Sequence, residues 1–322
     1  MLLDIDNLTL KLADRVARPL LSDISLRVAG GEVVGLVGES GSGKSTTART
    51  VLRMLPTGAD VTGTVRLKGQ DVLAMDQTQL RAHRARSVSM IYQDPRTSLN
   101  PVRRIGDFLT ERLIRVLGQP KREAVDNAVR LLGDVGLDEP DRRLNQYPHE
   151  LSGGMLQRVV IAAALATDPA LLLADEATSA LDVTTQADIL ALLKGLQEER
   201  DLGMLFITHD LHLAAAYCDR VYVMYAGRVV EHRAAEDLFT HPRHPYTRGL
   251  LDCSPTLGEY RELRPIVGRP PSLSDIQPGC PFAPRCAHAE DQCTSWTPKQ
   301  SETADGGTVS CRRAAALEGS LT

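Results

Sequence analysis

Gly38-Glu39-Ser40-Gly41-Ser42-Gly43-Lys44-Ser45-Thr46 stands directly after residues 32–37, which have the apolar character of a short buried strand. Residues 46–55 after it favour a helix, which Pro56 and Gly58 end. A strand, a glycine-rich loop and a helix in this order are the setting of a phosphate-binding loop. The glycines let successive backbone N–H groups point at one anion, and the positive N-terminus of the helix adds to the same site.

The loop predicts a site for a nucleoside triphosphate. We expect Lys44 to reach the β- and γ-phosphates and the Ser45 hydroxyl to ligate Mg²⁺. A glycine-rich turn that binds nothing is the alternative, and the complete motif in its strand and helix context disfavours it. The residues expected to contact the nucleotide are Gly38, Glu39, Ser40, Gly41, Ser42, Gly43, Lys44, Ser45 and Thr46.

The composition is that of a globular protein. The chain has 322 residues, of which 43% are apolar and 24% charged, and this length fits one large domain or two of ordinary size. With 37 Lys and Arg against 41 Asp and Glu, the net charge is −4, which gives no reason to expect a nucleic-acid partner. No apolar run is long enough to span a bilayer and no signal-peptide pattern is present, so we expect a cytosolic chain.

Periodicity predicts an α/β fold with a parallel core and an antiparallel β edge. The phosphate loop resembles that of the P-loop NTPases, and this resemblance implies a RecA-like core. The edge is expected from the alternating segments 3–12 and 20–28. Residues of about 94–160 have helical periodicity and are interpreted as a helical insert within a domain spanning 1–240. Residues 241–322 are rich in proline and predict a mostly irregular, Cys-rich extension. Further strands are expected at 63–69, 87–92, 171–175, 204–208 and 221–224.

Two carboxylates follow an apolar strand at Leu171–Ala174. Such a strand beside a phosphate loop delivers its terminal acids to Mg²⁺ and to the attacking water. Asp175 is expected to hold the metal, directly or through a water, and Glu176 to polarise the attacking water as general base. The pair alone is a weak signal, because many buried strands end in an acid, but with the upstream loop it becomes specific.

Leu151-Ser152-Gly153-Gly154-Met155-Leu156-Gln157-Arg158 opens a helix with backbone N–H groups and a serine hydroxyl at its positive end. On these residues alone an ordinary serine N-cap is an equal alternative. Placed between the phosphate loop and the Asp-Glu strand, however, the segment resembles the defining signature of the ABC-transporter ATPases. The resemblance extends over essentially the whole chain and implies ATP as the nucleotide.

The resemblance also implies roles for further residues. Gln93 matches the Q-loop glutamine, which touches Mg²⁺ together with Ser45 and Asp175, and His209 matches the switch histidine, which contacts the γ-phosphate and joins Glu176 and Lys44 as the catalytic set. In this family two ATPase domains pair head to tail. The residues expected to complete the site of the opposite subunit are Ser152, Gly153, Gly154, Gln157 and the D-loop residue Asp182.

The chain departs from the family at the adenine site. Family members usually stack adenine on an aromatic residue of the N-terminal sheet, yet residues 1–37 contain no Phe, Tyr, Trp or His. The guanidinium plane of Arg15 or Arg18 is the predicted replacement.

Residues 92–101 and His244-Pro245-Tyr246-Thr247 resemble the ABC importers of oligopeptides, dipeptides and nickel. The resemblance implies a peripheral ATPase at the cytoplasmic face of the membrane that energises peptide import. Its expected partners are a homologous ATPase subunit, two transmembrane permease subunits and an extracytoplasmic substrate-binding protein. Leu156 resembles the nickel-importing members, so an importer of nickel or a metal chelate is an alternative.

Four cysteines crowd the C-terminal extension: Cys280, Cys286, Cys293 and Cys311. Four thiols in a reducing compartment suit either tetrahedral Zn²⁺ or an iron–sulfur cluster. The short Cys-x₂-Cys pairs of most zinc ribbons are missing, and the resemblance to peptide-importer ATPases implies a [4Fe–4S] cluster. The cluster is therefore favoured over zinc or free thiols.

Two other classes of protein remain as alternatives. A soluble ABC ATPase acting on DNA or ribosomes is disfavoured by the single phosphate loop, the lack of long coiled-coil heptads and the negative net charge. A zinc-binding module with a vestigial ATPase is disfavoured because every catalytic motif is intact.

Overall fold

The structure is a computed structural model that describes residues 1–12, 19–254, 264–275 and 278–317. Its larger sheet has eight strands in the order β11-β12-β10-β9-β3-β8-β7-β6. The five strands from β9 to β6 run parallel, which confirms the predicted parallel core. These are β3 (Val33–Val37), β6 (Val88–Ile91), β7 (Leu171–Asp175), β8 (Gly203–Thr208) and β9 (Arg220–Tyr225).

Every residue of β3, β7 and β8 is buried, as expected for strands covered on both faces. Their apolar runs are what made them recognisable in the sequence. β10 (Arg228–Ala234) adds to β9 in the antiparallel sense and turns the parallel sheet into a mixed one.

The smaller sheet is antiparallel, with the order β2-β1-β4-β5. It contains β1 (Leu3–Leu12), β2 (Leu21–Val28), β4 (Ala59–Leu67) and β5 (Gln70–Asp71). Burial roughly alternates along β1 and β2, which confirms the predicted half-buried edge ahead of the core. β4 begins four residues before the predicted segment and ends at Leu67, because its pairing with β1 extends to Ala59.

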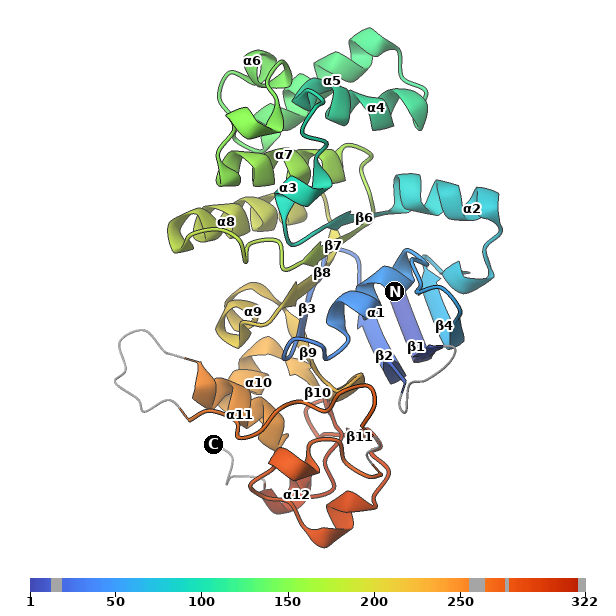
Figure 1. The fold of residues 1–322 in the computed structure, drawn as a ribbon, viewed down its shortest axis with the longest axis vertical. Helices are drawn as coiled ribbons and strands as arrows, with labels where there is room; N and C mark the ends of the chain where they lie inside the picture. The colour runs from blue at the N-terminus through green and yellow to red at the C-terminus, as the bar shows by residue number, and fades with distance from the viewer. Residues whose placement is uncertain (13–18, 255–263, 276–277, 318–322) are drawn as a thin grey trace.

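Helices cover the larger sheet and form a separate layer at one end of the molecule (Figure 1). That end contains α4 (Ile105–Arg115), α5 (Lys121–Asp134) and α6 (Pro140–Leu144), and α7 (Gly153–Leu165) and α3 (Pro95–Ser98) lie between it and the sheet. The other helices are α1 (Lys44–Val51), α2 (Gln77–Ala82), α8 (Val183–Glu199), α9 (Leu211–Tyr217), α10 (Ala235–Thr240), α11 (Pro245–Cys253) and α12 (Ala314–Leu317).

The described part of the segment after residue 240 lies against the larger sheet at the end opposite α4–α6 (Figure 1). β11 (Ser301–Glu302) and β12 (Thr308–Val309) form a short hairpin, and β12 pairs with β10 through Glu231↔Val309 and His232↔Thr308. These two-residue strands are too short to leave a periodic pattern in the sequence. Across the described ranges, no helix has the length and apolarity needed to cross a bilayer.

Candidate active site

The predicted site residues meet at the carboxyl edge of the parallel strands. The phosphate loop follows β3, Gln93 follows β6, Asp175 ends β7 and His209 follows β8. β3, β8, β7 and β6 are consecutive neighbours in the sheet, so their ends present these groups along one line. Ligands of open α/β sheets bind at such an edge.

The phosphate loop curls because its glycines adopt conformations that other residues avoid. Gly38 has φ +147° and Gly43 has φ +108°, and a Cβ atom on Gly38 would lie 2.1 Å from the Met224 carbonyl oxygen. Lys44 opens α1, and its Nζ donates to the carbonyl oxygens of Gly38 at 2.6 Å and of Glu39 at 3.0 Å. The ammonium is thereby held inside the loop that it would share with a phosphate.

Lys44 is buried, and burial lowers the pKa of its ammonium. The carboxylates of Glu176, Asp175 and Glu39 act in the opposite direction and favour the charged form. A cation surrounded by carboxylates at the N-terminus of a helix is suited to a polyanion bound with a metal ion.

Ser45 and Asp175 bring two oxygen ligands together. The Ser45 hydroxyl donates a 2.8 Å hydrogen bond to Asp175 Oδ1 at the end of β7. Burial raises the pKa of the Asp175 carboxyl, and the hydrogen bond from Ser45 and the charge of Arg49 oppose that shift. A hydroxyl and a carboxylate at this spacing are the hard oxygen donors that Mg²⁺ prefers, so the donor set fits the ion.

The Glu176 side chain contacts residues that follow two other strands, Gln93 after β6 and His209 after β8. Its Oε2 accepts a 2.8 Å hydrogen bond from Gln93 Nε2, and its Oε1 lies 3.5 Å from His209 Nδ1. Its backbone has φ +49°, a region that residues other than glycine rarely occupy, and its N–H donates to the Ile207 carbonyl on β8. This conformation turns the Glu176 side chain out of the β7 alternation and into a pocket of about 150 Å³ that it shares with His209.

The signature segment lies at the start of α7. Ser152 is exposed and its Oγ accepts from Met155 N–H at 3.3 Å, so it is the N-cap residue of the helix. Gly153 and Gly154 are half-exposed beside it. Gln157 differs from these residues, because its side chain is fully buried and neither amide atom has a hydrogen-bond partner within the described part of the chain.

Asp182 caps α8 and is exposed. It accepts hydrogen bonds from Thr185 N–H at 3.0 Å and Thr185 Oγ1 at 2.7 Å, and these bonds lower the pKa of its carboxyl. Arg15 and Arg18, the residues predicted to cover the adenine, lie outside the described residues.

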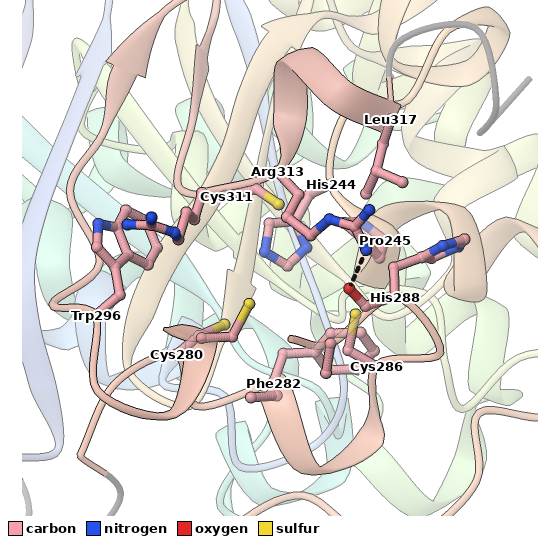
Figure 2. A pocket seen from close by; sticks show the side chains of 14 residues that line it. His244, Pro245, Cys280, Phe282, Cys286, His288, Trp296, Cys311, Arg313 and Leu317 are labelled. Carbon is pink, nitrogen blue, oxygen red and sulfur yellow. Dashed lines mark hydrogen bonds between the residues drawn. The ribbon is translucent and has the colours of Figure 1, made fainter. Parts of the chain in front are cut away.

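The four tail cysteines line one pocket, together with His244, Phe282 and Trp296 (Figure 2). Burial raises the pKa of the Cys280, Cys286 and Cys311 thiols, and neighbouring thiols raise it further; that of Cys311 reaches about 11. Among the described residues, no three His, Cys, Asp or Glu side chains are close enough together to hold a metal ion. The thiols share a pocket without forming a ligand set.

Two residues of the tail contact the phosphate loop and were missed by the sequence analysis. Tyr246 and Arg285 both bond to Glu39. Tyr246 belongs to the motif His244-Pro245-Tyr246-Thr247, which was read only as a mark of a subfamily, and Arg285 had no signal beyond its place beside Cys286.

Two families match this chain. The family described as "ABC transporter" matches residues 21–179, and the one described as "Oligopeptide/dipeptide transporter, C-terminal region" matches residues 230–293. The oligopeptide transport ATP-binding protein OppD of Salmonella typhimurium is 46% identical over 282 residues, which cover 87% of this chain and 84% of that protein. The OppD protein of Haemophilus influenzae is 45% identical over 295 residues, which cover 91% of each chain.

Solved structures show the same architecture. The dimeric ATP-binding cassette MJ0796, in a post-hydrolysis state bound to ADP and Pi, has a TM-score of 0.63 and 30% identity, and the match covers 72% of this chain and 98% of that one. The protein cbiO1 of Clostridium perfringens, part of the ABC transporter complex cbiONQ, has a TM-score of 0.64 and 25% identity, covering 74% and 90%. The chain therefore belongs to the ABC-transporter ATPases, in the group that carries the oligopeptide/dipeptide transporter C-terminal region.

Proposed function

We propose that this chain is the ATP-hydrolysing subunit of a membrane importer of di- and oligopeptides, bound peripherally at the cytoplasmic face. The observation that carries the ATPase part is the meeting of Lys44, Ser45, Asp175, Glu176 and His209 at one sheet edge. The peptide part rests on the C-terminal region at residues 230–293 and on the OppD relatives.

Each residue of the edge has a chemical role in this proposal. Lys44 binds the β- and γ-phosphates, and Ser45 with Asp175 and Gln93 holds Mg²⁺, which neutralises charge on the phosphates. Glu176 accepts a hydrogen bond from the attacking water and orients it as general base, and His209 contacts the γ-phosphate. The contacts of Gln93 and His209 with Glu176 support this grouping.

The second half of each site comes from another ATPase chain in this proposal. Ser152, Gly153 and Gly154 present an exposed helix N-terminus that suits a γ-phosphate held by a partner. Asp182 is exposed and free to face the same partner. Gln157 would support the signature segment from within the fold, since its side chain is buried.

The permease subunits have a fitting surface in the helical region. A groove of about 490 Å³ is lined mostly by apolar side chains, with the charged Glu111, Arg112 and Arg115 among them. The lining comes from β6, α4 and α7 and from residues next to them, including Tyr92, Phe108 and Val116. Tyr92 directly precedes Gln93, so a helix of a transmembrane subunit seated there would lie next to the nucleotide site. A substrate-binding protein outside the cell would deliver the peptide to the permease.

The tail is proposed as a second unit, with 1–240 as the ATPase domain, a helical subdomain at about 94–160 and an extension at 241–322. Within it we propose a [4Fe–4S] cluster on Cys280, Cys286, Cys293 and Cys311. The proposal is supported by the four thiols around one pocket, which are soft donors, and it requires them to move together into a ligand set when the cluster binds. Iron and zinc analysis of anaerobically purified protein separates the cluster from the alternatives, zinc and free thiols.

Transport by the native complex tests the proposed function. The complex purified from membranes and placed in proteoliposomes should import a labelled tripeptide only with ATP and the substrate-binding protein present. Import of Ni²⁺ or a nickel chelate in place of the peptide would favour the metal-importer alternative. Co-sedimentation of the chain with ribosomes or DNA, and not with membranes, would favour the soluble ABC ATPase.

A further inference from the structure

A buried ion pair joins the C-terminal tail to the phosphate loop. Arg285 Nη1 lies 2.7 Å from Glu39 Oε2, and Arg285 Nη2 lies 3.0 Å from Glu39 Oε1. The two parallel bonds are the bidentate geometry that an arginine forms with a carboxylate. The Arg285 side chain is only 5% exposed and that of Glu39 27%, so solvent screens this pair weakly.

Glu39 is held at each of its polar groups. Its N–H donates to the hydroxyl of the fully buried Tyr246 at 2.9 Å. Its carbonyl accepts from Lys44 Nζ at 3.0 Å and from Ser42 N–H at 3.2 Å. The carboxylate is bound by Arg285. Two tail residues, Tyr246 and Arg285, therefore hold the N–H and the carboxylate of Glu39, and Lys44 within the loop holds its carbonyl oxygen.

Arg285 is itself anchored by the tail and the sheet. Its Nε donates to the Val267 carbonyl at 3.1 Å, and its Nη1 donates to the Tyr225 hydroxyl at 3.3 Å. The guanidinium also lies over the Tyr225 ring, 5.8 Å from the ring centroid. These contacts fix the position of the positively charged Arg285 guanidinium.

The ion pair between Arg285 and Glu39 also changes the charge near the nucleotide site. Glu39 is the second residue of the phosphate loop and its carbonyl oxygen accepts from Lys44 Nζ at 3.0 Å, so its carboxylate belongs to the residue next to the expected triphosphate site. An unpaired carboxylate there would repel the nucleotide in a weakly screened site. Arg285 cancels that charge and turns the carboxylate toward the tail.

We infer that Arg285 is a positioning residue for the nucleotide site, which acts through Glu39 by neutralising its charge and fixing the phosphate loop. The inference rests on the proposed ATP site. It gives the tail a role in ATP binding, and it ties the segment that holds the cysteine pocket to the phosphate loop, because Cys286 follows Arg285 directly.

The test is the affinity of the full-length protein for N-methylanthraniloyl-ATP with Mg²⁺, measured by fluorescence titration beside a thermal melt. Arg285→Gln should weaken binding roughly tenfold. Glu39→Gln should strengthen it by about twofold to threefold, because a buried cation then faces the phosphates. The double variant Glu39→Gln/Arg285→Gln should return to within about threefold of wild type. Arg269→Gln, at an exposed arginine of the tail, is the matched control and should bind as wild type.

The opposite sign of the two single changes separates positioning by charge from a purely structural contact. If Glu39→Gln weakens binding, or if the double variant is as weak as Arg285→Gln, the inference is overturned. Should Arg285→Gln fail to fold, Glu39→Gln and Arg285→Lys still decide the question, with Arg285→Lys expected between wild type and the loss predicted for Gln. A wild-type protein that binds no nucleotide would instead reject the proposed function.

Discussion

The Ser45 hydroxyl and Asp175 Oδ1 lie 2.8 Å apart and join two segments that are 130 positions apart in the chain. Ser45 is in the first turn of α1, whereas Asp175 ends β7. β3, which leads into the phosphate loop and α1, is separated from β7 by β8 in the sheet, so the contact reaches across one intervening strand. It fixes the position of both oxygen atoms that we assign to Mg²⁺.

Ser45→Ala should raise the Mg²⁺ concentration needed for half-maximal nucleotide binding by about tenfold, since one oxygen ligand and the contact that orients Asp175 are both lost. Binding of the nucleotide in EDTA should change little. The measurement is a Mg²⁺ titration of N-methylanthraniloyl-ATP fluorescence. An unchanged Mg²⁺ midpoint would remove Ser45 from the metal site.

Glu176→Gln should lower the steady-state ATPase rate of the assembled complex by at least about 100-fold, because the amide cannot act as general base. The affinity for ATP should stay within about threefold of wild type, since Lys44 and Ser45 are untouched. Asp201→Asn is a matched control, because Asp201 is also an acidic residue with φ +49° and lies outside the site. Turnover retained in Glu176→Gln would assign the base to another residue.

The sequence predicted most of the edge that holds the site, because buried strands and the phosphate loop are local patterns. β3, β7 and β8 are mostly apolar runs; the phosphate loop follows β3, Asp175 ends β7 and Glu176 follows it, and His209 follows β8. The contacts of Tyr246 and Arg285 with Glu39 had no such signal, since they span 207 and 246 positions and depend on how the tail folds back. Tertiary packing alone brings them together.

Gln157 illustrates a second limit. The motif places it in the signature segment, and we expected it to face a partner chain. On α7 its position turns it inward, where it is fully buried among the apolar residues of the helix. A motif identifies which residues belong together, whereas the face of each residue depends on the neighbouring elements.

The buried imidazole of His244 should make the folded protein less stable in mild acid. Burial lowers the pKa of its imidazole to about 4, and its Nδ1 accepts a 3.0 Å hydrogen bond from Tyr246 N–H, which requires that nitrogen to be unprotonated. Between the ordinary pKa of 6.5 and about 4, the unfolded chain binds the proton and the folded chain does not. The free energy of unfolding should therefore fall as pH drops through this window, by about 1.4 kcal/mol per pH unit.

His244→Gln should remove that contribution while the amide oxygen still accepts from Tyr246 N–H. Urea denaturation at pH 7, 6 and 5 measures it, and wild type should lose more stability than the variant. His232, whose pKa burial also lowers to about 4, retains its own contribution in both proteins. His241→Gln, at an exposed position, should follow the wild-type curve. Parallel curves for wild type and His244→Gln would show that His244 is not the acid-sensitive group.

Asp305 should stabilise the docking of the β11–β12 hairpin through an ion pair with Arg233 of β10. The Arg233 side chain is 4% exposed and that of Asp305 26%, so Asp305→Asn removes a charge-assisted hydrogen bond from a buried cation and should cost about 2 kcal/mol in free energy of unfolding. Burial raises the pKa of Asp305, but hydrogen bonds from Thr303 and Gly307 and the charge of Arg233 outweigh it and lower the pKa to about 2.

A carboxyl with a lowered pKa contributes its stability above the ordinary value of 3.8 and loses it as pH falls through about 2. The difference between wild type and Asp305→Asn should therefore be constant from pH 5 to 7, where urea denaturation measures it. Asp291→Asn, at an exposed aspartate of the same tail, should change stability by less than about 0.5 kcal/mol. If both variants lose equally little, the ion pair does not hold the hairpin, and the β10–β12 ladder alone must do so.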